Sequence, residues 1–347
     1  MSVAIRRVHV RRYRLPYRAP VVTAHGRFEA RVGWLVGVES STGRFGWGDA
    51  APWPGFGSAA TGSPCDPAAV LSAAEGVHDD PDAFHRAVGA CVEAHAAFSQ
   101  AVLASAAEAD GVPLRDLAAD GPGAARVPVH ALVNTAEQAR AAVERGFETL
   151  KIKIGVAPLN DDLVRLDAIR RAVGPSVALR LDANGAWSWE AALHALRRLA
   201  EIGPAFVEQP CRDMSTCARL RSESDVRIAL DESLSSARDV HEALAREAMD
   251  VAIIKPAFFA SWTEAHAAAL QCRRLGVEVV VTCALESAIG RWGALHLAAA
   301  LGADGAPVSA AGLLAPVDPA HDVAPFPEVE AGHLAPTWTP GLGVMPC

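Results

Sequence analysis

The sequence predicts an α/β protein, a (β/α)7β-type TIM barrel with an N-terminal α+β capping domain. Eight short apolar runs recur after residue 126, and segments with helical spacing separate them. The first 120 residues lack this rhythm and combine strand-like alternation with alanine-rich helical stretches. An open doubly wound sheet stays as the alternative, because the number of strands alone does not show whether a sheet closes.

The capping domain is expected over residues 1–120. Alternating apolar and polar residues predict an antiparallel sheet, with strands at 3–15, 31–40 and 43–52. Segments rich in Gly, Pro and Ser predict loops, at 18–29 and 52–64. Helical spacing in the alanine-rich part predicts two helices, at 67–77 and 81–109.

The barrel is expected over residues 121–320. Its predicted strands are 127–133, 149–155, 177–185, 205–210, 227–233, 251–256, 277–286 and 307–314. Amphipathic segments such as TAEQARAAVERG and SWEAALHALRRLAEIG lie between them and predict helices. Residues 321–347 are rich in proline without a clear helical pattern, and we expect this tail to pack back on the capping domain.

Polar residues end six successive strands of the predicted barrel. They are Lys151, Lys153, Asp182, Asn184, Glu208, Asp231, Glu232, Lys255, Thr282, Cys283 and Glu286. A single carboxylate at a strand end is more often a helix cap or a loop charge. Six consecutive strands with such endings are hard to obtain from caps alone, and barrel enzymes gather their catalytic groups at these ends.

Three of these residues are carboxylates on adjacent predicted strands, namely Asp182, Glu208 and Asp231. Three buried negative charges repel one another unless a cation lies among them. Oxygen ligands without His or Cys favour Mg²⁺, with Mn²⁺ as a second choice. The sequence therefore predicts a divalent metal site formed by these three side chains.

The chain contains only three lysines against 29 arginines, and all three lysines lie in apolar runs. Codon bias explains the scarcity of lysine but not these buried positions. Lys153 and Lys255 are expected to approach a metal-bound substrate from opposite sides of the barrel. Lys151 shares a strand face with Lys153, and its charge is expected to lower the pKa of its neighbour. A metal-bound carboxylate beside such an amine is equipped for removal of an α-proton.

Five ordered motifs resemble the enolase superfamily, in particular its muconate-lactonising subgroup. They are KIKIG (151–155), LDANGAW (181–187), VEQP (207–210), LDESL (230–234) and IIKP (253–256). The segments GWGDAAPWPGFG (46–57), IKPAFF (254–259) and ALESAIG (284–290) are similar to those of the o-succinylbenzoate synthase family. The subgroup shares its machinery among racemases, epimerases, cycloisomerases and dehydratases, so the motifs are less specific for the reaction than for the subgroup.

The resemblance implies a Mg²⁺-dependent lyase of menaquinone biosynthesis that performs a syn dehydration of 2-succinyl-6-hydroxy-2,4-cyclohexadiene-1-carboxylate. In that scheme Lys153 removes the α-proton and then assists loss of hydroxide, while the charge of Lys255 stabilises the enediolate. The alternatives are an N-succinylamino acid racemase and a dipeptide epimerase. Epimerases of the family tend to carry an Asp-x-Asp pair at the eighth strand, and the corresponding run VSAAGLLAPVD has none.

The remaining candidates are expected around the substrate. Strand alternation places Arg180 and Asn184 on the face of Asp182, where Asn184 would support the metal site. Arg180 would contact the substrate or pair with a carboxylate, and Glu232 would support one of the lysines. Thr282, Cys283 and Glu286 would line the pocket. A purely structural role is the alternative for each of these residues.

Composition limits the partners of the chain. The net charge of −8 and the absence of a Lys/Arg cluster argue against nucleic acid. No run of 18 apolar residues predicts a membrane span, and the alternating start MSVAIRRVHVRRYRL predicts no signal peptide. We therefore expect a cytoplasmic enzyme acting on a small carboxylate, with scattered, reduced cysteines; homo-oligomerisation is left open.

Overall fold

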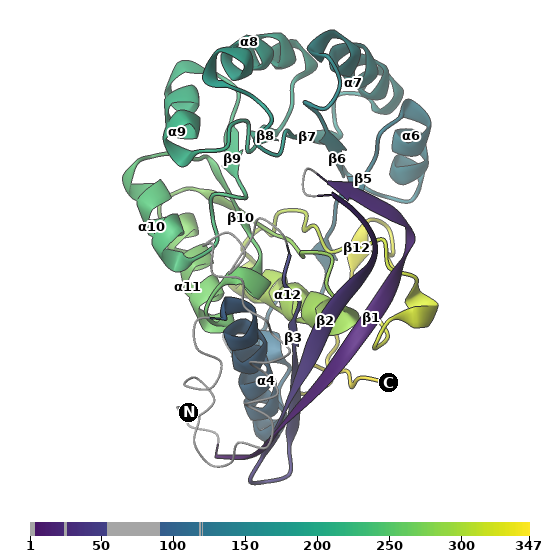
Figure 1. Ribbon diagram of the computed structural model, residues 1–347, viewed down its shortest axis with the longest axis vertical. Coiled ribbons are helices and arrows are strands. Elements are labelled where there is room, and N and C mark those ends of the chain that lie inside the picture. Colours follow the sequence, from purple (N-terminus) through teal and green to yellow (C-terminus); the bar gives the residue numbers. More distant parts are fainter. Residues whose placement is uncertain (1–3, 24–25, 54–90, 118, 120) are drawn as a thin grey trace.

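The computed structural model describes residues 4–23, 26–53, 91–117, 119 and 121–347. Figure 1 shows a ring of strands and helices joined to a unit of long strands and one long helix. The predicted helix at 67–77, the start of that at 81–109 and most of the loop at 52–64 lie outside the described residues.

The N-terminal unit is an antiparallel sheet covered by a helix. Strands β1 (Ile5–Thr23), β2 (Gly26–Ser40) and β3 (Phe45–Ala50) pair in that order. Helix α4 (Val92–Asp110) packs its small residues on the sheet. A Cβ at Gly48 would overlap the carbonyl oxygen of Ala97, so the absence of a side chain permits this close packing.

The predicted loop at 18–29 is wrong for most of its length. Val21 pairs with Phe28, and Thr23 pairs with Gly26, so the two strands continue toward their connection. The register shifts between Pro16 and Val21, which accommodates prolines that cannot donate ladder hydrogen bonds. Val21 and Phe28 pack against an apolar cluster that includes barrel residues, so this hairpin lies against the barrel.

The barrel consists of parallel strands in sequence order around a ring. A seven-stranded sheet runs from β11 to β5 without crossovers. Its strands are β5 (Ala131–Leu132), β6 (Thr149–Lys153), β7 (Ala178–Asp182), β8 (Phe206–Glu208), β9 (Ile228–Leu230), β10 (Val251–Ile254) and β11 (Glu278–Val281). The predicted first strand is divided into β4 (Val127–Pro128) and β5, and β4 pairs with β12 (His333–Leu334).

The eighth predicted strand closes the ring through isolated bridges. Ala311 pairs with Val129, and Gly312 pairs with Thr282, both in the parallel sense. The amide of Cys283 donates to the carbonyl of Gly312 at 2.9 Å, which joins this segment to the end of β11. The closed barrel with an N-terminal α+β unit is therefore confirmed, and the open sheet is excluded.

Helices follow the barrel strands and surround them (Figure 1). They are α6 (Ala136–Glu144), α7 (Leu159–Val173), α8 (Trp189–Leu199), α9 (Met214–Glu223), α10 (Ala237–Ala245), α11 (Trp262–Arg274) and α12 (Ala288–Ala300). Several begin at a side chain that accepts a backbone N–H: Thr135, Ser188, Asp213, Ser236 and Ser261. Every residue of α12 is buried, so this helix is part of the core between barrel and N-terminal unit.

The C-terminal tail contacts both parts of the molecule. Trp292 of α12 donates its indole N–H to the carbonyl of Pro325 at 2.8 Å. Leu114, in the short helix α5 (Leu114–Leu117), donates its amide to the carbonyl of Gly341 at 2.7 Å, and Arg11 of β1 donates to the carbonyl of Cys347 at 2.6 Å. The boundaries 1–120, 121–320 and 321–347 stay predictions.

Among the described cysteines, Cys91 departs from the expectation of reduced thiols. Cys91 is disulfide-bonded, whereas Cys211, Cys217, Cys272, Cys283 and Cys347 are free. Sequence spacing does not show which cysteines lie together in space, which is why the bond was not predicted.

Within the described residues, no helix combines the length and the apolar character that crossing a bilayer requires.

Candidate active site

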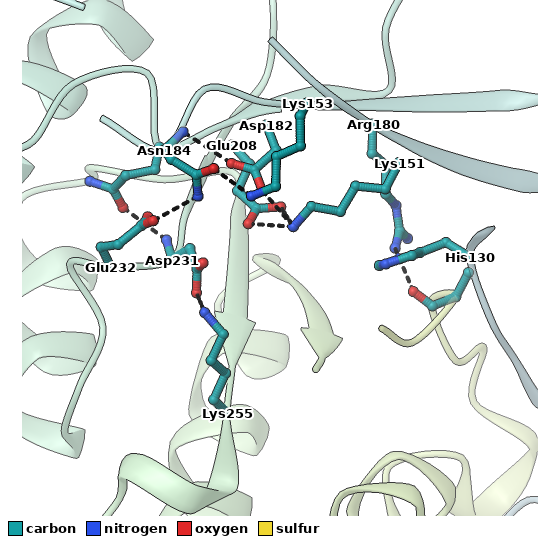
Figure 2. Close-up of polar contacts among 12 residues, drawn as sticks. His130, Lys151, Lys153, Arg180, Asp182, Asn184, Glu208, Asp231, Glu232 and Lys255 are labelled. Atoms are coloured by element: carbon teal, nitrogen blue, oxygen red, sulfur yellow. Dashed lines mark hydrogen bonds and ion pairs between the residues drawn. The ribbon is translucent and has the colours of Figure 1, made fainter. Parts of the chain in front are cut away.

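The polar residues predicted at the ends of β6 to β10 form one network at the carboxyl ends of these strands (Figure 2). Strand register explains their proximity, because Lys153 lies opposite Asp182, and Asp182 lies opposite Glu208. We call this set the strand-end network; its members are Lys151, Lys153, Asp182, Asn184, Glu208, Asp231, Glu232 and Lys255.

Lys151 lies between two carboxylates. Its Nζ is 2.8 Å from Asp182 Oδ2 and 2.8 Å from both carboxylate oxygens of Glu208. Burial alone would lower the pKa of Lys151, but the negative charges of Asp182, Glu208 and Asp231 raise it well above its ordinary value. Lys151 is therefore a fixed positive charge, and its expected effect on Lys153 stays a prediction.

Lys153 is the more accessible of the two lysines on β6. Its side chain is 44% exposed, compared with 13% for Lys151. Its Nζ donates to Asp182 Oδ2 at 2.8 Å and to Asn184 Oδ1. Asn184 donates in turn to Glu232 Oε1 at 2.8 Å, so Glu232 supports Lys153 through Asn184.

Lys255 enters the network from another side. Its ammonium group is paired with Asp231 Oδ1. Figure 2 shows Lys255 and Lys153 on opposite sides of the carboxylates of Asp182, Glu208 and Asp231. The approach of the two amines to a metal-bound substrate from opposite sides stays a prediction.

Acidic groups outnumber lysines in the strand-end network, four to three (Asp182, Glu208, Asp231 and Glu232 against Lys151, Lys153 and Lys255). Burial and the charges of Asp182 and Asp231 raise the pKa of Glu208 to about 8. Burial and Asp231 likewise raise the pKa of Glu232 to about 7. For Asp182, burial is outweighed by Lys151 and Lys153, which lower its pKa. Carboxyl groups with such raised pKa values retain a proton near neutral pH, so Glu208 and Glu232 carry less negative charge than their number implies.

The donor set fits a hard divalent cation. Asp182, Glu208 and Asp231 offer buried carboxylate oxygens, and burial, followed by the charge of Asp182, raises the pKa of Glu208. Among the described residues no three such side chains are arranged around an open metal position, because the lysine amines lie against these oxygens. The ammonium group of Lys151 lies between the carboxylates of Asp182 and Glu208 and supplies positive charge there. The roles of Asp182, Glu208 and Asp231 as metal ligands stay a prediction.

Gln209 contacts Asp231 of the strand-end network and is not among the residues predicted from the sequence. Its side-chain oxygen accepts the backbone N–H groups of Asp231 at 2.9 Å and Ser233 at 3.2 Å. Its Nε2 donates to the carbonyl of Cys211 at 2.8 Å and to Ser233 Oγ at 2.7 Å. Gln209 (φ +38°) and Asn184 (φ +45°) both have left-handed backbone conformations, which are uncommon outside glycine and gather at functional sites. Only the position of Gln209 within the EQP motif could have indicated it.

Arg180 lies outside the strand-end network. It donates to the carbonyl of Ala310, and its guanidinium is 3.3 Å from His130 Nδ1 and 3.7 Å from Glu278 Oε1. Burial lowers the pKa of Arg180 to about 10. Of the two roles considered, pairing with a carboxylate has a contact in the structure, namely Glu278 of β11, and the hydrogen bond to Ala310 joins the eighth segment to β7.

The residues after β11 form a second region. Thr282 donates its amide to the carbonyl of Ile254 at 2.9 Å, beside Lys255, and its buried hydroxyl has no hydrogen-bond partner among the described residues. Burial raises the pKa of Cys283 to about 12, so its thiol is neutral. Glu286 accepts the amide of Ala284, and its pKa is raised to about 7 by burial and by the charge of Asp49. Glu286 therefore belongs to the junction with the capping domain.

Two protein families match consecutive parts of the chain. A family described as "Enolase C-terminal domain-like" matches residues 134–347, which is more than half of the sequence. A second, described as "MenC, N-terminal domain", matches residues 5–77.

Curated relatives carry three different activities. The chain is 36% identical over 181 residues to o-succinylbenzoate synthase of Thermobifida fusca, covering 50% of this chain and 56% of that protein. It is 39% identical over 168 residues to a hydrophobic dipeptide epimerase of Enterococcus faecalis, covering 48% and 47%. It is 32% identical to an N-succinyl-L-Arg/Lys racemase of Bacillus cereus, covering 48% and 45%. The chain thus spans about half the length of these relatives.

Solved structures match over nearly the whole chain. A dipeptide epimerase from Enterococcus faecalis, complexed with Mg and the dipeptide L-Leu-L-Tyr, has a TM-score of 0.82 at 28% identity, covering 98% of this chain and 99% of that one. A muconate lactonizing enzyme from Pseudomonas fluorescens has a TM-score of 0.84 at 22% identity, covering 100% and 98%, and shares the fold. Because the family described as "Enolase C-terminal domain-like" matches more than half of the chain, and the MenC N-terminal domain matches the part before the barrel, the chain belongs to the enolase superfamily.

Proposed function

We propose that the chain is an o-succinylbenzoate synthase. It would convert 2-succinyl-6-hydroxy-2,4-cyclohexadiene-1-carboxylate to 2-succinylbenzoate and water, as a step of menaquinone biosynthesis. The observation that carries the proposal is the position of Lys153 and Lys255 on opposite sides of three buried carboxylates (Figure 2). The match to the MenC N-terminal domain and the relatives named o-succinylbenzoate synthase support this choice of reaction.

Lys153 is the proposed acid–base group. As a neutral amine it removes the proton from the carbon next to the substrate carboxylate, and its accessible Nζ suits that contact. The same group, now protonated, gives its proton to the hydroxyl on the neighbouring carbon, which leaves as water. Using one amine for both transfers requires both groups to leave from the same face. Asp182 and Asn184 hold Nζ in place.

Lys255 and the carboxylates have supporting roles in this proposal. Lys255 keeps its proton and places positive charge on the face opposite Lys153, where it stabilises the enediolate. Asp182, Glu208 and Asp231 would hold Mg²⁺, or Mn²⁺, which supplies positive charge for the substrate carboxylate. Lys151 balances the charges of Asp182 and Glu208.

A racemase or epimerase is the second candidate function. Amines on both faces of one carbon suit removal of a proton on one side and its return on the other. Relatives with these activities match the chain at similar identity. The run around Ala310 and Gly312 contains no Asp-x-Asp pair for a substrate ammonium. Among the alternatives this favours an N-succinyl amino acid over a dipeptide.

Assays with different substrates, together with one variant, distinguish the proposed dehydration from racemisation or epimerisation. With Mg²⁺, loss of the ultraviolet absorbance of the cyclohexadiene substrate reports dehydration, and no loss at high enzyme concentration would remove the proposal. In D₂O, deuterium at the α-carbon of N-succinyl amino acids or of L-Ala-L-Glu reports the alternative.

Lys255→Arg sharpens the distinction, because arginine keeps the charge but does not transfer a proton at neutral pH. Dehydration should fall only about 10- to 100-fold, since charge stabilisation is retained in part. Racemisation should be lost in this variant, since it needs proton transfer on both faces. Complete loss of dehydration in folded Lys255→Arg would contradict the role given to Lys255.

A further inference from the structure

A carboxylate of the capping domain reaches into the barrel at the start of α12. Asp49 of β3 is buried, and its Oδ2 accepts the backbone N–H of Ser287 at 2.9 Å and the hydroxyl of Ser287 at 2.6 Å. The hydroxyl of Tyr13 in β1 lies 2.8 and 2.9 Å from the two oxygens of Asp49. One carboxylate therefore joins β1, β3 and the barrel helix.

This contact replaces the usual cap of α12. Ser287 is the N-cap residue, but its side chain makes no hydrogen bond to its own helix. The first amides of the helix are accepted by carboxylates from elsewhere: Asp49 accepts Ser287, and Asp322 accepts Ala288 at 2.9 Å. Unpaired N–H groups and the helix dipole both favour negative charge at this end.

The packing around Asp49 leaves little freedom. A Cβ at Gly290 would overlap Glu286 Cγ and would lie 3.2 Å from Asp49 Oδ2. The helix can therefore approach both carboxylates only because residue 290 has no side chain. Asp49 cannot move toward the barrel without displacing Glu286 or the helix itself.

The residues next to Asp49 border the strand-end network. Trp53, four residues later, packs in one apolar cluster with Phe258 and Ala284. Phe258 follows Lys255 by three residues, and Ala284 follows Thr282. Arg31 lies over the ring of Trp53 at 4.7 Å and donates to the carbonyl groups of the segment between Asp49 and Trp53. The segment 49–53 is thus held as one body against the loop 282–287.

We propose that Asp49 is a positioning residue that sets the capping domain against the barrel, and thereby places Trp53 and the loop 282–287 for substrate binding. It does not touch the substrate or the reacting atoms. Its removal therefore weakens binding and leaves the acid–base step of Lys153 in place. The inference rests on the proposed function only in locating the substrate at the strand ends.

The kinetic test compares two carboxylates that cap the same helix. Asp49→Ala should raise KM about tenfold, the equivalent of about 1.4 kcal/mol, and change kcat less than about threefold. Asp322→Ala removes the other cap and the partner of Arg291, without any contact to β1 or β3. That control should lower the melting temperature at least as much and leave KM unchanged. Asp49→Asn keeps an acceptor for Ser287 and should restore most of the affinity.

A second readout needs no substrate. Hydrogen–deuterium exchange of the free protein should show the loop 282–287 exchanging about tenfold faster in Asp49→Ala than in the wild type, because a cap worth about 1.4 kcal/mol is lost. This exchange result stands whether or not the proposed reaction is correct, so the two proposals can fail separately. Equal KM increases in Asp49→Ala and Asp322→Ala, or unchanged exchange in Asp49→Ala, would overturn the inference. Where Asp49→Ala does not fold, Ser287→Ala removes the hydroxyl contact alone, and an unchanged KM in that variant would overturn it equally.

Discussion

The strand-end network and the junction around Asp49 both bury carboxylates, but they neutralise them in different ways. In the network, Asp182, Glu208 and Asp231 face lysine amines on flexible side chains. At the junction, Asp49 faces hydroxyl groups and a backbone N–H. Flexible amines can leave a carboxylate for a metal ion or a substrate, whereas a helix amide cannot. The network is therefore suited to chemistry and the junction to placement.

Substitutions in the two regions should also differ in their effect on stability and function. Removing one partner of a buried ion pair leaves an uncompensated charge, which costs about 3–5 kcal/mol. Removing a neutral donor at the junction lowers the free energy of unfolding by about 1–3 kcal/mol, because a single buried atom is left without its hydrogen bond. Variants that break an ion pair of the network should therefore abolish function and lower stability more, and variants at the junction should shift affinity and lower stability less.

Lys153→Arg gives the largest expected effect. A guanidinium does not act as a base at neutral pH, so kcat should fall by at least about a thousandfold. The positive charge beside Asp182 remains, so the circular dichroism spectrum and melting temperature should stay close to those of the wild type. Turnover within about tenfold of the wild type would show that Lys153 is not the base.

Glu208→Gln and Glu232→Gln form a matched pair within the network. Both side chains are carboxyl groups with raised pKa values, but Glu208 pairs with Lys151 and Glu232 with Asn184. Glu208→Gln should weaken Mg²⁺ binding by about a hundredfold or more, measured by calorimetry, because the site loses one ligand charge. Glu232→Gln should retain Mg²⁺ binding and lower kcat modestly. Equal affinity in the two variants would contradict the assignment of Glu208.

Glu286 should make the stability of the protein depend on pH. Its pKa rises from 4.5 to about 7 on folding, so the folded state binds a proton more tightly than the unfolded state. Its contribution is fully favourable below about pH 4.5 and is lost as the pH rises through about 7. In Glu286→Gln the free energy of unfolding should therefore decrease less between pH 4.5 and about pH 7 than in the wild type, as measured by urea titration. An unchanged slope in the variant would show that Glu286 ionises normally.

Thr282→Val should give the smallest change in stability and a clear change in binding. The buried hydroxyl of Thr282 has no partner in the part of the chain that the structure describes, so an isosteric apolar replacement should alter the unfolding free energy by less than about 0.5 kcal/mol. If this hydroxyl contacts the substrate, KM should rise about tenfold. An unchanged KM would remove Thr282 from the substrate site.

The strand-end network could be predicted from sequence because each residue is placed by its own strand. Lys153, Asp182 and Glu208 each end a short apolar run, and parallel strands bring such ends together. Asp49 and Gln209 could not be recognised in this way, because their partners are backbone groups of distant segments. The continuation of β1 and β2 through 18–29 was missed because proline and glycine usually indicate loops.

The proposed chemistry depends on a divalent cation held by Asp182, Glu208 and Asp231, with amines on either side. Anomalous diffraction from a crystal grown with Mn²⁺ shows whether such a cation binds there. We expect one strong peak bonded to oxygens of all three carboxylates, with Lys151 and Lys255 moved away from them. A peak elsewhere, or amines still paired with the acids and no peak between them, would contradict it.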